Sequence, residues 1–133
     1  VIGNLDGYAA ELAMPNLDED SFQRLDDAVN RMELAINKRD YSMYYEWQEA
    51  FHAIYWDKCG NNFLIKLIQN TLRQTVRPSY YQNNSRVLFK ILENMNQEHR
   101  EIVEKLRNKD RVGLRDFTIS HWSNNHSDEK KDN

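Results

Sequence analysis

Apolar side chains recur at steps of three and four residues along most of the chain, with polar and charged residues between them. Because an α-helix turns once in about 3.6 residues, this spacing places the apolar side chains of each segment on one face. Six segments show the pattern and are predicted to be helices. They lie at residues 2–14, within 16–40, at about 40–58, 62–76 and 85–107, and in a short last stretch at 112–119.

The residues at the ends of these segments are typical of helix boundaries. Pro15 and Pro78 stop the first and fourth helices, because proline lacks the amide hydrogen that a continuing helix needs. Asp18 or Asn16 is the expected N-cap of the second helix, and Gly60 is the expected C-terminal cap of the third. Six helices joined by short loops predict an all-α fold, an antiparallel bundle of about six helices, in which binding sites lie between facing helices.

Length and composition support a single helical domain. The chain has 133 residues with only four Gly and two Pro, so the turn dipeptides that would separate a row of short strands are scarce. We expect residues 1–123 to form the bundle. The polar segment 124–133 is expected to be a disordered tail, because it has too little apolar surface to bury. The chain starts without Met and already in a helical pattern, which indicates a fragment of a longer protein.

The charge and the cysteine content argue against several classes of function. The formal net charge is −3 and the isoelectric point is about 5.8, so this chain lacks the basic excess that neutralises the phosphates of DNA or RNA. It contains no run of about 18 apolar residues that would span a membrane. The single cysteine, Cys59, rules out an internal disulfide framework and fits a reducing compartment. We therefore expect a cytoplasmic location and no membrane partner.

Three of the four histidines fall on three different predicted helices. His52, His99 and His121 could converge inside a compact bundle and hold a divalent metal through their ring nitrogens. Gln48 lies one helical turn before His52 on nearly the same face, although its amide oxygen is a weaker ligand than a carboxylate. Taken singly, each histidine is more often a surface or hydrogen-bonded structural residue. On spacing alone, both interpretations stay open.

The residues around the histidines give little support for catalysis. Glu49 and His52 form a Glu-x-x-His pair of the kind found in di-iron bundles, which need a second such pair and two further carboxylates. The residues three positions before the other two histidines are Asn96 and Thr118, so the di-iron interpretation fails. Cys59 lies at a predicted helix C-terminus, where the helix dipole disfavours the thiolate that a nucleophile requires. We therefore expect the protein not to be an enzyme.

Three blocks of the sequence together resemble the FCD domain, the C-terminal effector-binding domain of one branch of the GntR-type bacterial transcriptional regulators. They are "LDGYAAELA" at Leu5–Ala13, "FHAIYWDKCGNNFL" at Phe51–Leu64, and "EHREIVEKLRNKDRVGLRDFTISH" at Glu98–His121. In the first block Asp6 stands where the family usually has glutamate. The three blocks occur in the order and spacing of the family and span almost the whole chain.

The resemblance implies a metal site. The family's pocket commonly binds a divalent metal through three histidines and an Asp or Asn four residues before the first of them. Carried over by position, the ligands are His52, His99 and His121, with Gln48 at the fourth position. Zinc and nickel are the metals that this set of ligands favours. Glutamine departs from the family pattern, so a weaker affinity or a water in its place is expected.

The resemblance also implies a small carboxylate effector bound beside the metal. An Arg that is often found near the start of the family's first helix would fall at about Ile2, so that cation is absent here. Arg73 is the candidate replacement, because a guanidinium that points inward binds a carboxylate through two hydrogen bonds. A surface position is the plain alternative for this residue. Asn96, one turn before His99, is a candidate for a further polar contact with the effector.

The function implied by the resemblance is therefore regulatory. The domain would sense an organic acid and modulate DNA binding by an attached N-terminal winged-helix domain, which is not present in this chain. A homodimer is expected, because DNA half-sites are related by a two-fold axis. Two other classes of function stay open. One is a metal-dependent enzyme on a helical bundle, with Glu49 or Glu98 as its base, and the other is a metal-free interaction or dimerisation bundle.

Overall fold

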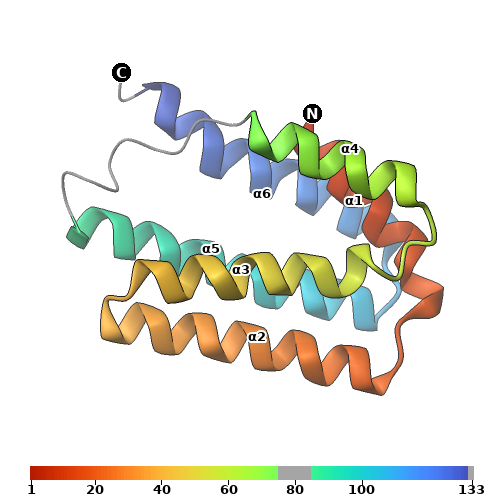
Figure 1. Cartoon of the computed structure of the whole chain (residues 1–133), viewed down its shortest axis with the longest axis horizontal. Helices are drawn as coiled ribbons and strands as arrows, with labels where there is room; N and C mark the ends of the chain where they lie inside the picture. The colour runs from red at the N-terminus through yellow and green to blue at the C-terminus, as the bar shows by residue number, and fades with distance from the viewer. Residues whose placement is uncertain (75–84, 132–133) are drawn as a thin grey trace.

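The computed structural model describes residues 1–74 and 85–131, and the side chains of all of these except 85 and 124–131. Within these ranges the chain forms helices and no strands. The helices are α1 (Ile2–Ala13), the 3-10 helix η1 (Met14–Asn16), α2 (Glu19–Lys38), α3 (Tyr41–Trp56), α4 (Asn62–Arg73), α5 (Ser85–Arg107) and α6 (Arg111–Lys131). The predicted all-α bundle is confirmed (Figure 1).

Consecutive helices run in opposite directions (Figure 1). α2 packs against α3 and α5, α1 packs against α3, α4 and α6, and α5 packs against α6. The core between them is formed by apolar side chains from all six helices, among which Leu25, Phe51 and Leu114 are fully buried. The three helices that carry the predicted ligands, α3, α5 and α6, therefore face one common interior.

α1 lies close to α6 because two of its residues are glycines. A Cβ atom added to Gly3 would lie 2.8 Å from the Cα of Ile119, and one added to Gly7 would lie 2.5 Å from Oγ1 of Thr118. Side chains at these two positions would push the helices apart. Their absence allows Asp6, next to Gly7, to reach the interior that α1 shares with α6.

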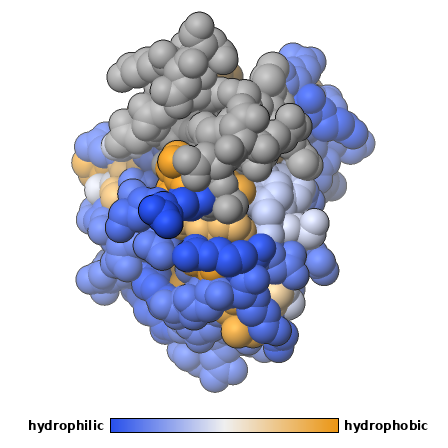
Figure 2. Space-filling view, turned by 90° about the vertical axis from the view of Figure 1, so that its left-hand side faces the viewer, coloured by the Kyte–Doolittle hydropathy of each residue, from blue (hydrophilic) through white to orange (hydrophobic). Residues whose placement is uncertain are grey.

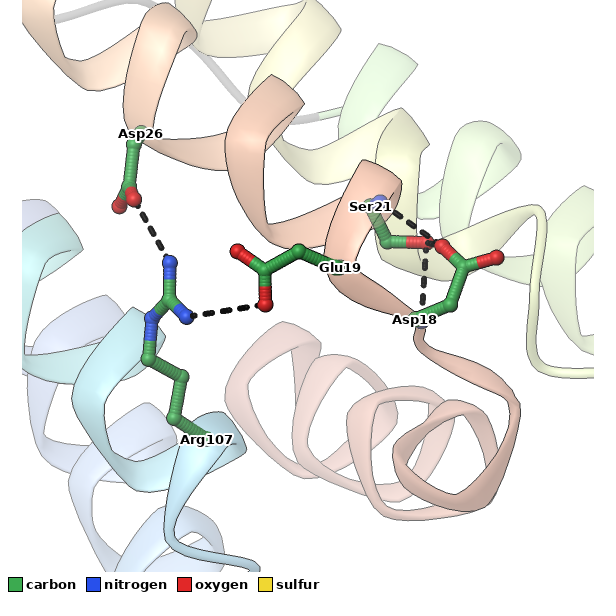
Figure 3. Close-up of polar contacts among 5 residues, drawn as sticks. All are labelled: Asp18, Glu19, Ser21, Asp26 and Arg107. Atoms are coloured by element: carbon green, nitrogen blue, oxygen red, sulfur yellow. Dashed lines mark hydrogen bonds and ion pairs between the residues drawn. The ribbon is translucent and has the colours of Figure 1, made fainter.

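The N-terminus of α2 is capped by its own side chains. The backbone N–H of Ser21 donates to Oδ1 of Asp18 at 2.9 Å, and the backbone N–H of Asp18 donates to Oγ of Ser21 at 3.4 Å. This reciprocal pair is a capping box (Figure 3). It makes Asp18 the N-cap, rather than the alternative residue Asn16.

A cluster of charged side chains joins the start of α2 to the end of α5 on the surface. The guanidinium of Arg107 lies 2.7 Å from Oδ2 of Asp26 and 3.9 Å from Oε2 of Glu19 (Figure 3). It also lies over the ring of Phe22, 4.6 Å from the ring centroid. We call these four residues the Arg107 cluster.

Two predicted helix ends need correction or fall outside the described residues. α3 ends at Trp56 with Asp57 as its C-cap in a right-handed conformation, so Gly60 is not the cap. Gly60 instead takes a left-handed conformation, with φ of 75°, in the loop that follows. α4 ends at Arg73, and the predicted end of this helix at 76–78 lies outside the described residues.

The last helix is longer than the sequence analysis expected. α6 runs from Arg111 to Lys131, so its backbone continues through residues 124–131, which had been assigned to a disordered tail. The sequence from 114 to 131 contains neither Gly nor Pro. A helix satisfies its backbone hydrogen bonds within its own segment, so it can extend without burying more side chains.

The surface seen from the end of the bundle is mainly hydrophilic, with apolar side chains visible in smaller patches (Figure 2). In the part of the chain that the structure describes, no helix is long and apolar enough to cross a membrane.

Candidate functional site

The structure brings the rings of three histidines together in the interior. The exposed fractions of His52, His99 and His121 are 3%, 0% and 2%. The ring centroids of His52 and His99 are 5.6 Å apart, and those of His99 and His121 are 5.3 Å apart. These rings come from α3, α5 and α6, so the cluster joins three helices that are distant in sequence.

Each histidine is oriented by a partner at its Nδ1 atom, and for His52 this partner is Tyr55. Nδ1 of His52 lies 2.9 Å from the hydroxyl oxygen of Tyr55, which in turn donates to Oδ1 of Asp6 at 2.5 Å. A phenol has only one hydrogen. Because Asp6 accepts it, Nδ1 of His52 must donate to Tyr55. The lone pair of neutral His52 is therefore on Nε2.

The same reasoning fixes the protons of the other two rings. Nδ2 of Asn96 donates to the carbonyl oxygen of Val29 at 3.1 Å, so the amide presents Oδ1 to Nδ1 of His99 at 3.2 Å. Nδ1 of His121 lies 2.6 Å from Oε1 of Glu98, and a carboxylate accepts. All three rings thus carry hydrogen on Nδ1 and, when neutral, a lone pair on Nε2.

Burial keeps two of these rings neutral at physiological pH. Desolvation is the main reason that the pKa of His52 is lowered from 6.5 to about 4, against an opposing effect of Asp6. Desolvation likewise lowers the pKa of His99 well below its ordinary value, and the neighbouring His121 and His52 add to the shift. Their Nε2 lone pairs are therefore available near pH 7.

Several buried acceptor atoms, two of them in the cluster and one on α3, have no hydrogen-bond donor. Nε2 of His52, Nε2 of His99 and Oε1 of Gln48 are all buried without a partner. Gln48 lies one turn before His52 on α3. Leaving a buried polar atom unsatisfied costs about 1–3 kcal/mol. A set of acceptors without donors is the arrangement that a bound cation would satisfy.

The residues present fit a divalent metal. Neutral imidazole nitrogen and amide oxygen suit zinc or nickel, and hydrogen bonds at Nδ1 orient histidine ligands in known metal sites. Two imidazoles on one tetrahedral zinc have centroids roughly 5 Å apart, close to the two separations above. Among the described residues, however, no group of three or more His, Cys, Asp or Glu side chains is already arranged to hold a metal. Ligation would require the side chains to shift.

Comparison with known proteins identifies the family of the chain. Residues 2–124 match the family model of the FCD domain. The chain belongs to the FCD family. This domain is the C-terminal effector-binding domain of GntR-family regulators, so the resemblance seen in the three sequence blocks is confirmed. No curated protein matches the chain.

In this FCD domain, the two predicted effector contacts lie elsewhere or have another role. Arg73 is exposed on α4 and donates to Asn70, one turn earlier, which is the surface position given as its alternative. α4 packs against α1. Asn96 is buried, but its amide is already bonded to Val29 and His99. Its role is to orient His99.

The two carboxylates considered as catalytic bases also have other positions. Glu49 is exposed on α3, although it lies only three residues before His52. Glu98 accepts the hydrogen bond from His121. Glu98 is thus the partner of a candidate ligand, and the family to which the chain belongs is one of regulatory proteins.

Four residues that hold or contact His52 were not singled out from the sequence. These are Asp6, Tyr55, Trp56 and Trp122. Asp6 is fully buried, and its place in the stripe of apolar residues at 2, 9 and 13 was the signal that could have revealed it. An acidic residue on the buried face of a helix needs buried donors, and Tyr and Trp are the residues that supply them.

Proposed function

We propose that this FCD domain binds a divalent metal, zinc or nickel, through His52, His99 and His121, with Gln48 as a weaker fourth ligand. The observation that carries the proposal is the set of imidazoles that are held at Nδ1, two of which present a buried Nε2 without a donor. The metal would supply a positive charge and an open coordination position at which a small carboxylate effector binds.

The residues of the chain have separate tasks in this proposal. Tyr55, Asn96 and Glu98 hold the three rings, and burial excludes water and keeps His52 and His99 neutral. Tyr44 is the candidate for a contact with the effector, because its hydroxyl is buried without a partner and lies two turns before His52 on α3. It takes the place that we had expected for Arg73.

The regulatory consequence follows from linkage between binding and conformation. An effector shifts a regulator only by the difference between its affinities for two arrangements, typically about 1–3 kcal/mol. We propose that binding in this domain changes the geometry of winged-helix domains attached to it in a cytoplasmic homodimer, and so modulates operator binding. The negative charge of the chain leaves contact with DNA to those domains.

Metal analysis of matched variants tests the proposal. The purified domain, supplied with zinc or nickel and then dialysed, should retain about one metal per chain by elemental analysis. His99→Ala should lose it, whereas His126→Ala, which removes the fourth histidine of the sequence, should retain it. Metal at a hundred times its dissociation constant should also raise the free energy of unfolding by roughly 2.7 kcal/mol.

The opposite results distinguish the alternatives. No retained metal and no change in unfolding with either ion would contradict metal binding and favour a metal-free interaction bundle. Retention by His99→Ala equal to that of the parent chain would place the metal elsewhere.

A further inference from the structure

Asp6 is a fully buried carboxylate that accepts three hydrogen bonds. Its Oδ1 accepts from the hydroxyl of Tyr55 at 2.5 Å and from Nε1 of Trp56 at 2.7 Å, and its Oδ2 accepts from Nε1 of Trp122 at 2.8 Å. The donors come from α3 and α6, so one side chain of α1 ties three helices together. The ion pairs formed among the described residues do not include Asp6.

Each of the three donors also contacts the ring of His52. Tyr55 accepts from its Nδ1 at 2.9 Å. The ring of Trp56 stacks on it with an interplanar angle of 15° and a centroid distance of 5.2 Å, and the ring of Trp122 lies 5.4 Å away. By fixing these three side chains, Asp6 fixes the orientation of His52.

We propose that Asp6 is a positioning residue of the histidine cluster, which holds His52 with its proton on Nδ1 through Tyr55 and supplies a buried negative charge that favours a divalent cation at Nε2. This inference rests on the proposed function and extends it to a residue that does not touch the metal. Two side chains have different effects. The hydroxyl of Tyr55 sets the position of the proton on His52, and the carboxylate of Asp6 supplies the charge.

The charge has a defined electrostatic consequence. An unpaired buried carboxylate is unfavourable even with three hydrogen bonds, because its charge is not compensated in a medium of low dielectric constant. A cation bound at the far side of the His52 ring would compensate it, whereas an anion bound there would be repelled. Substitution of a residue that acts through a metal ligand in this way typically changes the metal affinity by about 10–100-fold.

Two substitutions test the two effects separately. Asp6→Asn removes the charge and the acceptor for Trp122, but its amide oxygen can still accept from Tyr55 and Trp56. Tyr55→Phe removes the acceptor for Nδ1 of His52 and leaves the carboxylate. Glu11→Gln is the matched control, because Glu11 is a carboxylate of the same helix that pairs with Arg115 at 2.7 Å instead.

The readouts are the zinc dissociation constant, from competition with a chromophoric chelator, and the tautomer of His52 in the metal-free chain, from ¹⁵N chemical shifts of its ring. We expect Asp6→Asn to weaken zinc binding about 10-fold with the Nδ1–H form retained. We expect Tyr55→Phe to weaken it about 10–100-fold, with the Nδ1–H form no longer dominant. Glu11→Gln should change neither quantity.

The outcomes keep this inference apart from the proposed function. If the parent chain binds neither zinc nor nickel, the proposed metal site is contradicted, and so is the effect of the Asp6 charge on metal affinity. The tautomer of His52 still shows whether the network positions its ring. A parent chain with His52 in the Nε2–H form, or a Tyr55→Phe chain with unchanged tautomer and affinity, would overturn the inference. Zinc binding by Asp6→Asn as tight as that of the parent chain would overturn the charge effect. If Asp6→Asn does not fold, the tautomer and the zinc affinity of Tyr55→Phe still test whether the network positions His52.

Discussion

Two polar clusters of the described residues, the Arg107 cluster and the hydrogen-bond network of Asp6, differ in burial and in how their charges are compensated. The Arg107 cluster joins α5 to α2 through side chains that are 37% exposed for Arg107 and 52% for Asp26. The network of Asp6 joins α1 to α3 and α6 through side chains that are almost completely buried. Exposed ion pairs contribute about 0–1 kcal/mol, because water already solvates the separate charges. Buried polar networks are costly to disrupt, because water cannot replace a lost partner.

The comparison indicates where function lies in this domain. The Arg107 cluster has opposite charges in direct contact, so its electrostatics are balanced within the protein. The buried cluster has a carboxylate bonded only to neutral donors and two histidine nitrogens without donors. Uncompensated charge and unpaired polar atoms in the interior of a folded protein are a reason to expect a ligand there.

The largest expected effect is from the removal of the buried acceptor. Asp6→Ala leaves the buried hydroxyl of Tyr55 and two indole N–H groups without their partner, at about 1–3 kcal/mol for each. We expect the free energy of unfolding, measured by urea denaturation, to fall by about 4 kcal/mol or more, or the chain not to fold. Glu11→Ala, on the same helix, should cost about 1 kcal/mol or less. Equal losses in the two variants would contradict the larger cost expected for the buried network of Asp6.

Acid should destabilise the metal-free domain through His52. Its pKa is lowered from 6.5 to about 4 in the folded state, so between these values the unfolded chain binds the proton and the folded chain does not. Stability is therefore greatest above pH 6.5 and falls as the pH decreases to 4, by roughly 3 kcal/mol for this group. Urea denaturation in the presence of a chelator measures it. A His52→Gln variant should lose less over the same range, and an equal loss would contradict the assignment.

The close approach of α1 to α6 should be sensitive to a single methyl group. Gly7→Ala places Cβ against Oγ1 of Thr118 and should cost about 1–3 kcal/mol through overpacking. The double variant Gly7→Ala with Thr118→Ala removes the clash, so its loss should be smaller than the sum of the two single losses. Additive losses, measured by thermal or urea unfolding, would show that the contact is not tight.

The smallest expected effect is at the surface cluster. Arg107→Met keeps most of the apolar part of the side chain and removes the charged guanidinium that lies over Phe22. We expect a loss of about 1 kcal/mol or less, which should shrink further in high salt because exposed charges are screened. A loss as large as that of Asp6→Ala would mean that exposure does not separate the two clusters.

Much of the fold was predictable because it depends on local sequence. The helical period locates all six helices, and the choice of Asp18 as N-cap follows from side chains within three residues of each other. The extent of α6 was not predictable from burial, because its last turns follow from the lack of a helix-breaking residue. Local patterns therefore specify the helices better than they specify where a polar helix ends.

The candidate site was predictable only in part. Histidines on three helices suggested convergence, and His52 and His99 bond to partners only three residues away, Tyr55 and Asn96. The residues that hold those partners, and the ring of His52, come from across the chain. Asp6 is 49 positions from Tyr55 and 116 from Trp122, and Asn96 is 67 positions from Val29. Such pairings are set by how the helices pack, which also explains why Arg73 is on the surface although it lies on an amphipathic helix. The sequence indicates which side chains are candidate ligands. The packing of the helices determines which ring nitrogen of each histidine carries the proton.

The most direct test of the central claim is anomalous diffraction at the zinc edge, from crystals of the domain grown with one equivalent of zinc. We predict one dominant peak between His52, His99 and His121, with metal-to-nitrogen distances of about 2.0–2.1 Å. Peaks only at surface carboxylates, such as those of the Arg107 cluster, would contradict the claim.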